Sequence, residues 1–102
     1  DIGSHFPDND EKYKDISSME LLKQTISIMK EKNYILSNTD ITIIIEKPKM
    51  RDFIDLMREN LSKALNTSID NISIKAKTNE KMDAVGEGKA VAVHCVTLLE
   101  KI

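Results

Sequence analysis

Five consecutive residues, Ile41-Thr42-Ile43-Ile44-Ile45, are all branched at Cβ, and this run constrains the fold more than any other feature of the chain. Branched side chains are stiff at χ1 and favour extended backbone. The run is bounded by Asn38 and Pro48, which makes it short for a helix, and it is apolar enough to be buried. We therefore predict a buried strand that ends at a Lys-Pro-Lys loop.

Two segments with helical periodicity flank this strand. The first starts at Ser17-Ser18-Met19-Glu20, which matches a capping box, and Asn33 is its expected terminator. The second follows Met50 and is closed by Asn66. Apolar residues recur at helical spacing in both, at Met19, Leu22, Ile26 and Met29 and then at Phe53, Ile54, Met57, Leu61, Ala64 and Leu65.

Two further segments are predicted to be strands. Ile72, Ile74 and Ala76 alternate with polar residues, which predicts a half-buried strand. The nearly apolar segment 90–99 is expected to be a last strand, buried on both faces in places. Residues 1–16 are rich in Asp, Gly, Pro and Asn and are expected to form a loop.

This order of loop, helix, strand, helix, strand, strand predicts one domain of the α+β class. The expected architecture is a two-layer sandwich, in which a mixed β-sheet is covered on one face by helices. The other face would be bare, and a bare sheet face favours oligomerisation.

Composition excludes several classes of function. The chain of 102 residues has 15 Lys and Arg against 17 Asp and Glu, so it has no basic field for nucleic acid. No apolar run approaches the roughly 18 residues of a membrane span. The single cysteine, Cys95, cannot form an intrachain disulfide, and we expect it to be a small core residue in a reducing compartment. There is no Ser-His-Asp, Walker or dinucleotide-binding motif, so covalent catalysis is not indicated.

Three loops flank the predicted strand ends, namely 1–10, 46–52 and 77–89. The second carries Lys47, Lys49 and Arg51, and the third carries hydroxyl, amide, carboxylate and ammonium groups at 78–81. Such groups suit a diphosphate and the divalent metal that bridges its oxygens. If the loops converge they form one site. The alternative is that each is an ordinary solvated loop.

Zinc is not favoured by the residues present. His5, His94 and Cys95 are the only soft ligands. His94 and Cys95 are adjacent in a predicted strand, so their side chains point to opposite faces. His5 is expected to be a solvent-exposed imidazole.

Three motifs together resemble the 2-C-methyl-D-erythritol 2,4-cyclodiphosphate synthase family. They are Asp1-Ile2-Gly3 followed by Phe6-Pro7-Asp8-Asn9-Asp10, the loop Lys47-Pro48-Lys49-Met50, and the segment 75–81, which reads Lys-Ala-Lys-Thr-Asn-Glu-Lys. The resemblance covers essentially the whole chain. It implies a phosphorus-oxygen lyase of the non-mevalonate isoprenoid pathway. Members convert 4-diphosphocytidyl-2-C-methyl-D-erythritol 2-phosphate to the 2,4-cyclodiphosphate and release CMP.

The resemblance also implies residue roles. Glu80 would ligate Mg²⁺ or Mn²⁺ on the substrate diphosphate, and Thr78 would donate to the charge that develops in the transition state. Backbone groups of Ile45, Lys49, Met50 and Arg51 would recognise cytosine, and Pro48 would shape that loop. Asp1 and Gly3 would hold the ribose or erythritol hydroxyls, and the loop 6–10 would close over the methylerythritol phosphate. The full set of substrate-binding residues is Asp1, Ile2, Gly3, Phe6, Pro7, Asp8, Asn9, Asp10, Ile45, Glu46, Lys47, Pro48, Lys49, Met50, Arg51, Lys77, Thr78, Asn79 and Glu80.

The chain departs from the family pattern in places. Asp52-Phe53-Ile54 replaces a common Pro-His-Ile, and the segment 83–90, with Glu87 in place of an arginine, is closer to plastid-type members. The family zinc is held by an Asp-x-His and a second His that would lie upstream of Asp1. Residues 1–102 are thus expected to be the C-terminal two-thirds of the domain, inactive alone, with Zn²⁺ ligands absent from this chain.

The family resemblance further implies a homotrimer formed through the sheets, with active sites at subunit interfaces, and no nucleic-acid or membrane partner. The Lys, Asn and Ile richness favours a plastid or apicoplast location, with bacterial cytoplasm as the alternative. Two other readings stay open. One is a catalytically silent trimeric remnant that keeps nucleotide binding, and the other is an unrelated nucleotide-binding domain.

Overall fold

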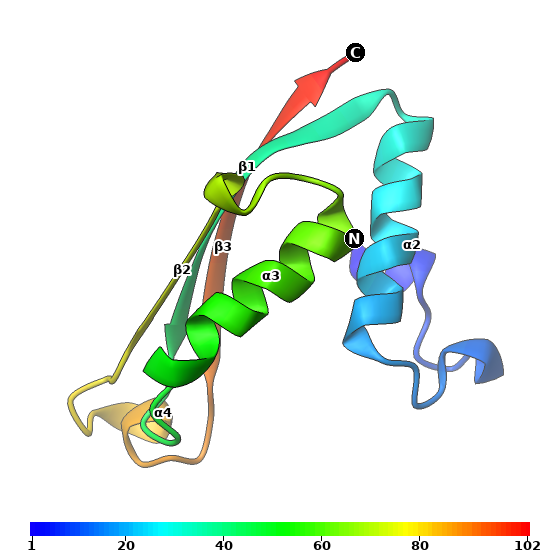
Figure 1. The fold of residues 1–102 in the computed structure, drawn as a ribbon. Helices are drawn as coiled ribbons and strands as arrows, with labels where there is room; N and C mark the ends of the chain where they lie inside the picture. Colours follow the sequence, from blue (N-terminus) through cyan, green and yellow to red (C-terminus); the bar gives the residue numbers. More distant parts are fainter.

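The computed structural model describes residues 1–102 and confirms the α+β class. Helices α2 and α3 lie on one face of a single sheet, as Figure 1 shows. The helices are α1 (Ile2–His5), α2 (Ser18–Glu31), α3 (Ile54–Leu65) and α4 (Asp83–Gly86), the strands are β1 (Tyr34–Ile44), β2 (Ile72–Lys77) and β3 (Ala92–Lys101), and 3₁₀ turns span Glu11–Tyr13, Arg51–Phe53 and Ile69–Asn71.

The sheet has three strands in the order β2-β1-β3, with β1 parallel to β2 and antiparallel to β3. It is therefore the mixed sheet that was predicted. β1 is longer than the predicted strand, because it begins at Tyr34 and continues through a bulge between Leu36 and Asn38. The β-branched run forms its second half, which pairs with both neighbours.

The core lies between the sheet and α3. Ile43, Ile72 and Ile74 form the buried cluster, and Ile72 is 1% exposed. Met57, Leu61 and Leu65 of α3 pack against the cluster, as the helical periodicity predicted. On the side of α3 that faces β2, Arg58 donates through Nε to the carbonyl oxygen of Ile72 at 2.8 Å. The helix is thus fixed to the start of β2 by a charged hydrogen bond as well as by apolar contact.

The predicted start of α2 and the two predicted terminators are confirmed, whereas α3 begins at Ile54, after a 3₁₀ turn, rather than at about Met50. Ser17 Oγ accepts from the Glu20 backbone N–H at 3.2 Å, which is the first half of the capping box. Asn33 and Asn66 end the two helices with φ of 66° and 52°, in the left-handed region that asparagine tolerates.

Three predictions about local structure were wrong. Residues 1–16 contain α1 and a 3₁₀ turn, since the carboxylates of Asp1 and Asp10 cap them by accepting from backbone N–H groups. β3 is exposed along almost its whole length, because the helices pack mainly on β1 and β2 and leave its side chains largely uncovered. Cys95 is for the same reason exposed rather than a core residue.

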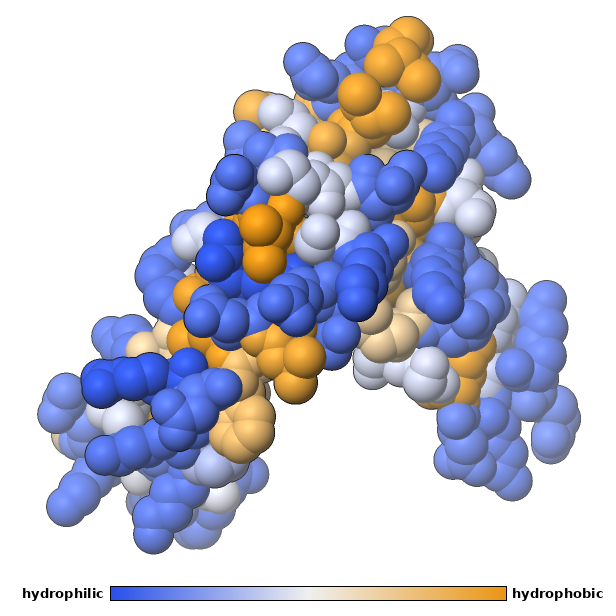
Figure 2. Space-filling model, in the orientation of Figure 1, coloured by the Kyte–Doolittle hydropathy of each residue, from blue (hydrophilic) through white to orange (hydrophobic).

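The molecule has two projecting ends that are mostly hydrophilic (Figure 2). In the orientation of Figure 1, one is the end of the sheet that carries α4, and the other is the N-terminal segment beneath α2. Hydrophobic side chains gather between these ends and at the top of the view in Figure 2. No helix is both long and apolar enough to cross a membrane. The end that carries α4 is also where the predicted site lies.

Candidate functional site

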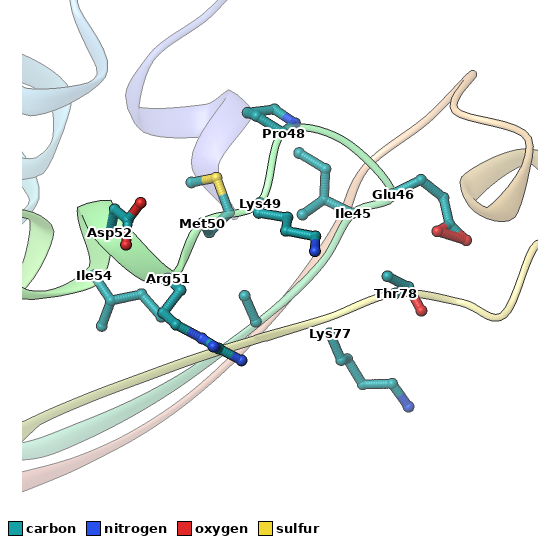
Figure 3. A pocket seen from close by; sticks show the side chains of 11 residues that line it. Ile45, Glu46, Pro48, Lys49, Met50, Arg51, Asp52, Ile54, Lys77 and Thr78 are labelled. Atoms are coloured by element: carbon teal, nitrogen blue, oxygen red, sulfur yellow. The ribbon is translucent and has the colours of Figure 1, made fainter.

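A cavity of about 440 Å³ lies at the carboxyl ends of the parallel strands β1 and β2 (Figure 3). The ends of parallel strands are a common place for ligand sites in α/β sheets. Ile45 continues the ladder past β1, since its N–H donates to the carbonyl oxygen of Lys77 at 2.9 Å. The cavity is lined by Ile45, Glu46, Pro48, Lys49, Met50, Arg51, Asp52, Ile54, Ala76, Lys77 and Thr78.

Two of the three predicted loops therefore meet. The loop 46–52 forms one wall, and the end of β2 with Thr78 forms the other. Met50 and Ile54 also pack against the core cluster, so the floor of the cavity is anchored to the sheet. In Figure 3 the side chains of Lys49 and Arg51 extend over the space between the walls. Their positive charges suit an anionic ligand.

The segment that follows β2 has an unusual backbone. Glu80, Lys81 and Asp83 have φ of 52°, 60° and 54°, a region that residues other than glycine rarely adopt. The Asn79 side-chain amide stabilises this turn by donating to the Met82 carbonyl oxygen and to Asp83 Oδ1, both at 3.0 Å. Backbone held in such a region is a frequent feature of ligand-binding sites.

Thr78 and Glu80 are close together in this turn. The Glu80 backbone N–H points toward Thr78 Oγ1 at 3.4 Å, a long contact. Thr78 lines the cavity, whereas Glu80 is exposed outside it. The hydroxyl is thereby placed at the cavity wall, and the carboxylate is free to meet solvent or a metal ion.

Glu46 connects the two walls. Its Oε1 accepts from the Lys81 backbone N–H at 2.9 Å, across 35 residues of sequence. In Figure 3 its carboxylate lies on the side away from Arg51 and Asp52. The sequence placed Glu46 among the substrate-binding residues, and the structure shows it holding the neighbouring loop.

The remaining predicted loop, residues 1–10, does not line this cavity. Asp1 accepts from the backbone N–H groups of Gly3 and Ser4, and Asp10 accepts from that of Lys12 at 3.2 Å. Phe6 packs edge-on against Tyr13 with ring centroids 5.4 Å apart. The substrate-binding roles of Asp1, Ile2, Gly3, Phe6, Pro7, Asp8, Asn9 and Asp10 stay predictions.

The structure brings together no group of three or more His, Cys, Asp or Glu side chains that could hold a metal ion. Two adjacent residues of β3, His94 and Cys95, pair with Thr42 and Ile41 of β1 and so face opposite sides of the sheet. Cys95 Sγ instead lies 3.3 Å from Thr39 Oγ1 on the helix side. A zinc site does not fit these residues.

The clear pKa shifts lie outside the cavity. The Lys75 ammonium donates to the Asp40 carboxylate at 2.6 and 2.8 Å and lowers the pKa of that carboxyl, with a smaller contribution from Ser73. The hydroxyl of Tyr13 raises the pKa of Lys12. Both pairs are on exposed surfaces, where water screens them.

Sequence reasoning missed three residues that line the cavity, Asp52, Ile54 and Ala76. Ala76 could have been found, because it alternates in phase with Ile72 and Ile74 on the helix side of β2. The hydrogen bond from the Lys81 backbone N–H could not be predicted from the sequence, since every residue other than proline has such a donor.

The chain is similar to several known proteins. The model of the YgbB family matches residues 1–100. The 2-C-methyl-D-erythritol 2,4-cyclodiphosphate synthase of Brachyspira hyodysenteriae is 72% identical over 101 residues, which are 99% of this chain and 64% of that protein. The chain thus spans about two-thirds of the length of this relative.

Two solved structures are also similar. The bifunctional IspDF of Campylobacter jejuni is 36% identical with a TM-score of 0.95, over 100% of this chain and 28% of that one. The IspF of Plasmodium falciparum, solved as a CDP complex, is 34% identical with a TM-score of 0.84, over 99% of this chain and 60% of that one.

Proposed function

Because the chain belongs to the YgbB family, we propose that it is part of a 2-C-methyl-D-erythritol 2,4-cyclodiphosphate synthase. The reaction converts 4-diphosphocytidyl-2-C-methyl-D-erythritol 2-phosphate to the 2,4-cyclodiphosphate and releases CMP. The observation that carries the proposal is the cavity at the ends of β1 and β2, where the Pro48-Lys49-Met50 loop faces Thr78. A similar protein, 34% identical and solved as a CDP complex, supports a cytidine nucleotide as the ligand of this cavity.

The proposed chemistry needs no protein nucleophile. An oxygen of the substrate 2-phosphate attacks the β-phosphorus, a new P–O bond forms, and the bond from that phosphorus to the oxygen bridging the α-phosphate breaks, so that CMP leaves with the bridging oxygen. Catalysis then consists of positioning and charge neutralisation. A reaction of this kind agrees with the sequence, which has no motif for covalent catalysis.

Each wall has a task in this scheme. Backbone groups of 45–51 bind the cytosine, and the positive charges of Lys49 and Arg51 attract the phosphates. The Thr78 hydroxyl donates a hydrogen bond to phosphate oxygens as negative charge develops on them. Lys77 also lines the cavity, but in Figure 3 its side chain extends away from the loop that carries Lys49 and Arg51.

A divalent cation fits one part of the site. Glu80 is an exposed carboxylate beside Thr78, and carboxylate and diphosphate oxygens are the ligands that Mg²⁺ and Mn²⁺ prefer. Bound there by Glu80 and the substrate, the cation would neutralise phosphate charge. The expected Zn²⁺ has no ligand set in residues 1–102, and we propose that its ligands lie upstream. The 102-residue chain alone is then expected to be inactive.

We further propose a homotrimer assembled through the sheets, with the cavity near a subunit interface. The sheet face opposite the helices is uncovered, and Val96 and Leu98 of β3 are 73% and 57% exposed on it. For the location, a relative 72% identical from a bacterium favours bacterial cytoplasm over a plastid or apicoplast.

The test is turnover of the cytidyl substrate by the full-length protein with Glu80→Ala beside it. Loss of a metal-binding carboxylate is expected to lower kcat by about 100-fold or more. Glu87→Ala is the matched control, since Glu87 lies in the same region, is exposed and pairs only with Lys89 at 2.8 Å. Equal rates for the wild type and Glu80→Ala would remove Glu80 from the mechanism. No turnover by the wild type, with CDP still bound in preference to ADP, would favour the catalytically silent remnant.

A further inference from the structure

The two walls of the cavity are joined at two levels. The first is the last rung of the β1–β2 ladder, from the Ile45 N–H to the Lys77 carbonyl oxygen. The second lies beyond the ladder, where Glu46 Oε1 accepts from the Lys81 N–H at 2.9 Å. Between these two rungs lie Thr78 and Glu80, the residues on which the proposed chemistry depends.

The Lys81 N–H depends on Glu46. No backbone carbonyl accepts a hydrogen bond from it, and the left-handed φ of Glu80 and Lys81 turns it away from the usual local partners. A hydrogen bond between a carboxylate and a backbone N–H is stronger than a neutral one. Glu46 therefore stabilises a backbone conformation that costs free energy by itself.

A second contact, from Gly86 of α4, supports the same backbone. A Cβ added to Gly86 would lie 2.2 Å from the carbonyl carbon of Lys81, so only glycine permits the observed approach of α4. Lys81 is thus held by Glu46 through its N–H and contacted by Gly86 at its carbonyl group. The turn between Thr78 and Asp83 has little freedom to move while both contacts remain.

Glu46 is poorly suited to bind the diphosphate directly. A carboxylate repels phosphate oxygens, and one of its two oxygens is already used by Lys81.

We infer that Glu46 is a positioning residue, whose carboxylate fixes Thr78 and Glu80 at a set distance from the nucleotide-binding loop through the Lys81 N–H. This inference rests on the proposed function. It assigns to Glu46 a role in the chemical step rather than in binding the nucleotide.

The experiment compares Glu46→Ala with Glu46→Gln in the full-length protein, with Glu87→Ala as the control. Loss of the acceptor is expected to lower kcat by about 10- to 30-fold, as for one hydrogen bond to a charged group. The affinity for CMP should stay within about threefold, because the backbone of 45–51 is retained. Glu46→Gln should recover most of kcat, since its amide oxygen can accept the same bond.

Amide hydrogen exchange at Lys81 supplies a readout that does not depend on activity. Exchange should become faster in Glu46→Ala and stay near the wild-type rate in Glu46→Gln. Unchanged exchange in Glu46→Ala overturns the inference, as does a kcat equal to that of the wild type. A Glu46→Gln variant as slow as Glu46→Ala also overturns it, because charge rather than the acceptor would then matter.

These outcomes are distinguishable from failure of the proposed function. If Glu80→Ala turns over at the wild-type rate while Glu46→Ala is slow, the assignment of Glu80 fails and the hydrogen bond to Lys81 acts through Thr78 alone. If the wild type shows no turnover, both proposals fail.

Discussion

The two projecting ends of the molecule are ordered in different ways. At the end that carries the cavity, segments far apart in sequence hold each other, as Glu46 and Lys81 do across 35 residues. In residues 1–16, every hydrogen bond stays within the segment, and so does the contact of Phe6 with Tyr13. Both ends were predicted to bind one substrate, yet only the first has long-range hydrogen bonds that fix its shape.

This difference indicates which part of the predicted site is formed before the ligand arrives. The loops 46–52 and 78–83 are anchored to the sheet, so the proposed binding of a nucleotide there would need no large rearrangement. Residues 1–16 form only local hydrogen bonds, and segments held in this way open at low free-energy cost. We expect the N-terminal segment to adjust when the rest of the substrate binds.

Gly86→Ala tests the anchored end and should have the largest effect. The new Cβ would overlap the Lys81 carbonyl carbon, so the turn that carries Thr78 and Glu80 must shift. A shift of roughly 1 Å at a positioning group can lower kcat by about 100-fold, and overpacking of this kind costs about 2 kcal/mol. Turnover and urea unfolding of the full-length protein measure the two effects.

Gly88→Ala is the matched control for that variant. Gly88 also has a positive φ, of 75°, but open space surrounds its Cβ position. The substitution should cost about 1 kcal/mol in backbone strain and leave kcat near the wild-type value. If Gly86→Ala and Gly88→Ala lower kcat equally, the contact with Lys81 does not matter for the site.

Tyr13→Ala tests the locally ordered end and should have an intermediate effect. It removes the edge-on contact with Phe6, which is worth about 1 kcal/mol to the segment. Amide exchange in residues 6–16 should become faster, while the urea midpoint of the protein stays unchanged. A clear fall in the midpoint would show that the segment is coupled to the core after all.

Asp40→Asn tests the sheet beneath the anchored loops and should have the smallest effect. Lys75 lowers the pKa of the Asp40 carboxyl in the folded protein. The ion pair therefore stabilises the fold at pH values above the pKa of this carboxyl in the unfolded chain, about 3.9. This stabilisation is lost as the pH falls through the lower pKa of the folded state. The wild type should exceed Asp40→Asn slightly in unfolding midpoint at pH 7, and the two should converge below about pH 4. Asp55→Asn, at a 91% exposed side chain, is the control. A difference that persists at low pH would rule out ionisation of Asp40 as its cause.

The sequence predicted the sheet and its helical cover because periodicity and branching at Cβ act locally. It did not predict where β1 begins. The bulge at Ser37 inserts one residue, so Leu36 and Thr39 face the same side although they are three apart. Strict alternation is lost there, and only the branched run beyond the bulge reads as a strand.

Pro48, Lys49, Met50 and Thr78 were predicted as site residues, and the structure brings them to one cavity, whereas Lys47 of the same loop does not line it. The hydrogen bond from Lys81 to Glu46 could not be predicted, because it depends on a backbone group and on φ values that non-glycine residues seldom adopt. Cys95 was misplaced because burial of a strand side chain depends on what covers its face of the sheet, and the helices pack mainly on β1 and β2.

The free edge of β3 has a practical consequence for handling the protein. A ten-residue strand with unpaired backbone groups and exposed Val96 and Leu98 is a template onto which another chain can add a strand. The purified 102-residue chain is therefore expected to aggregate as its concentration rises. A charged substitution at Val96 would act as a gatekeeper and keep it in solution for biophysical work.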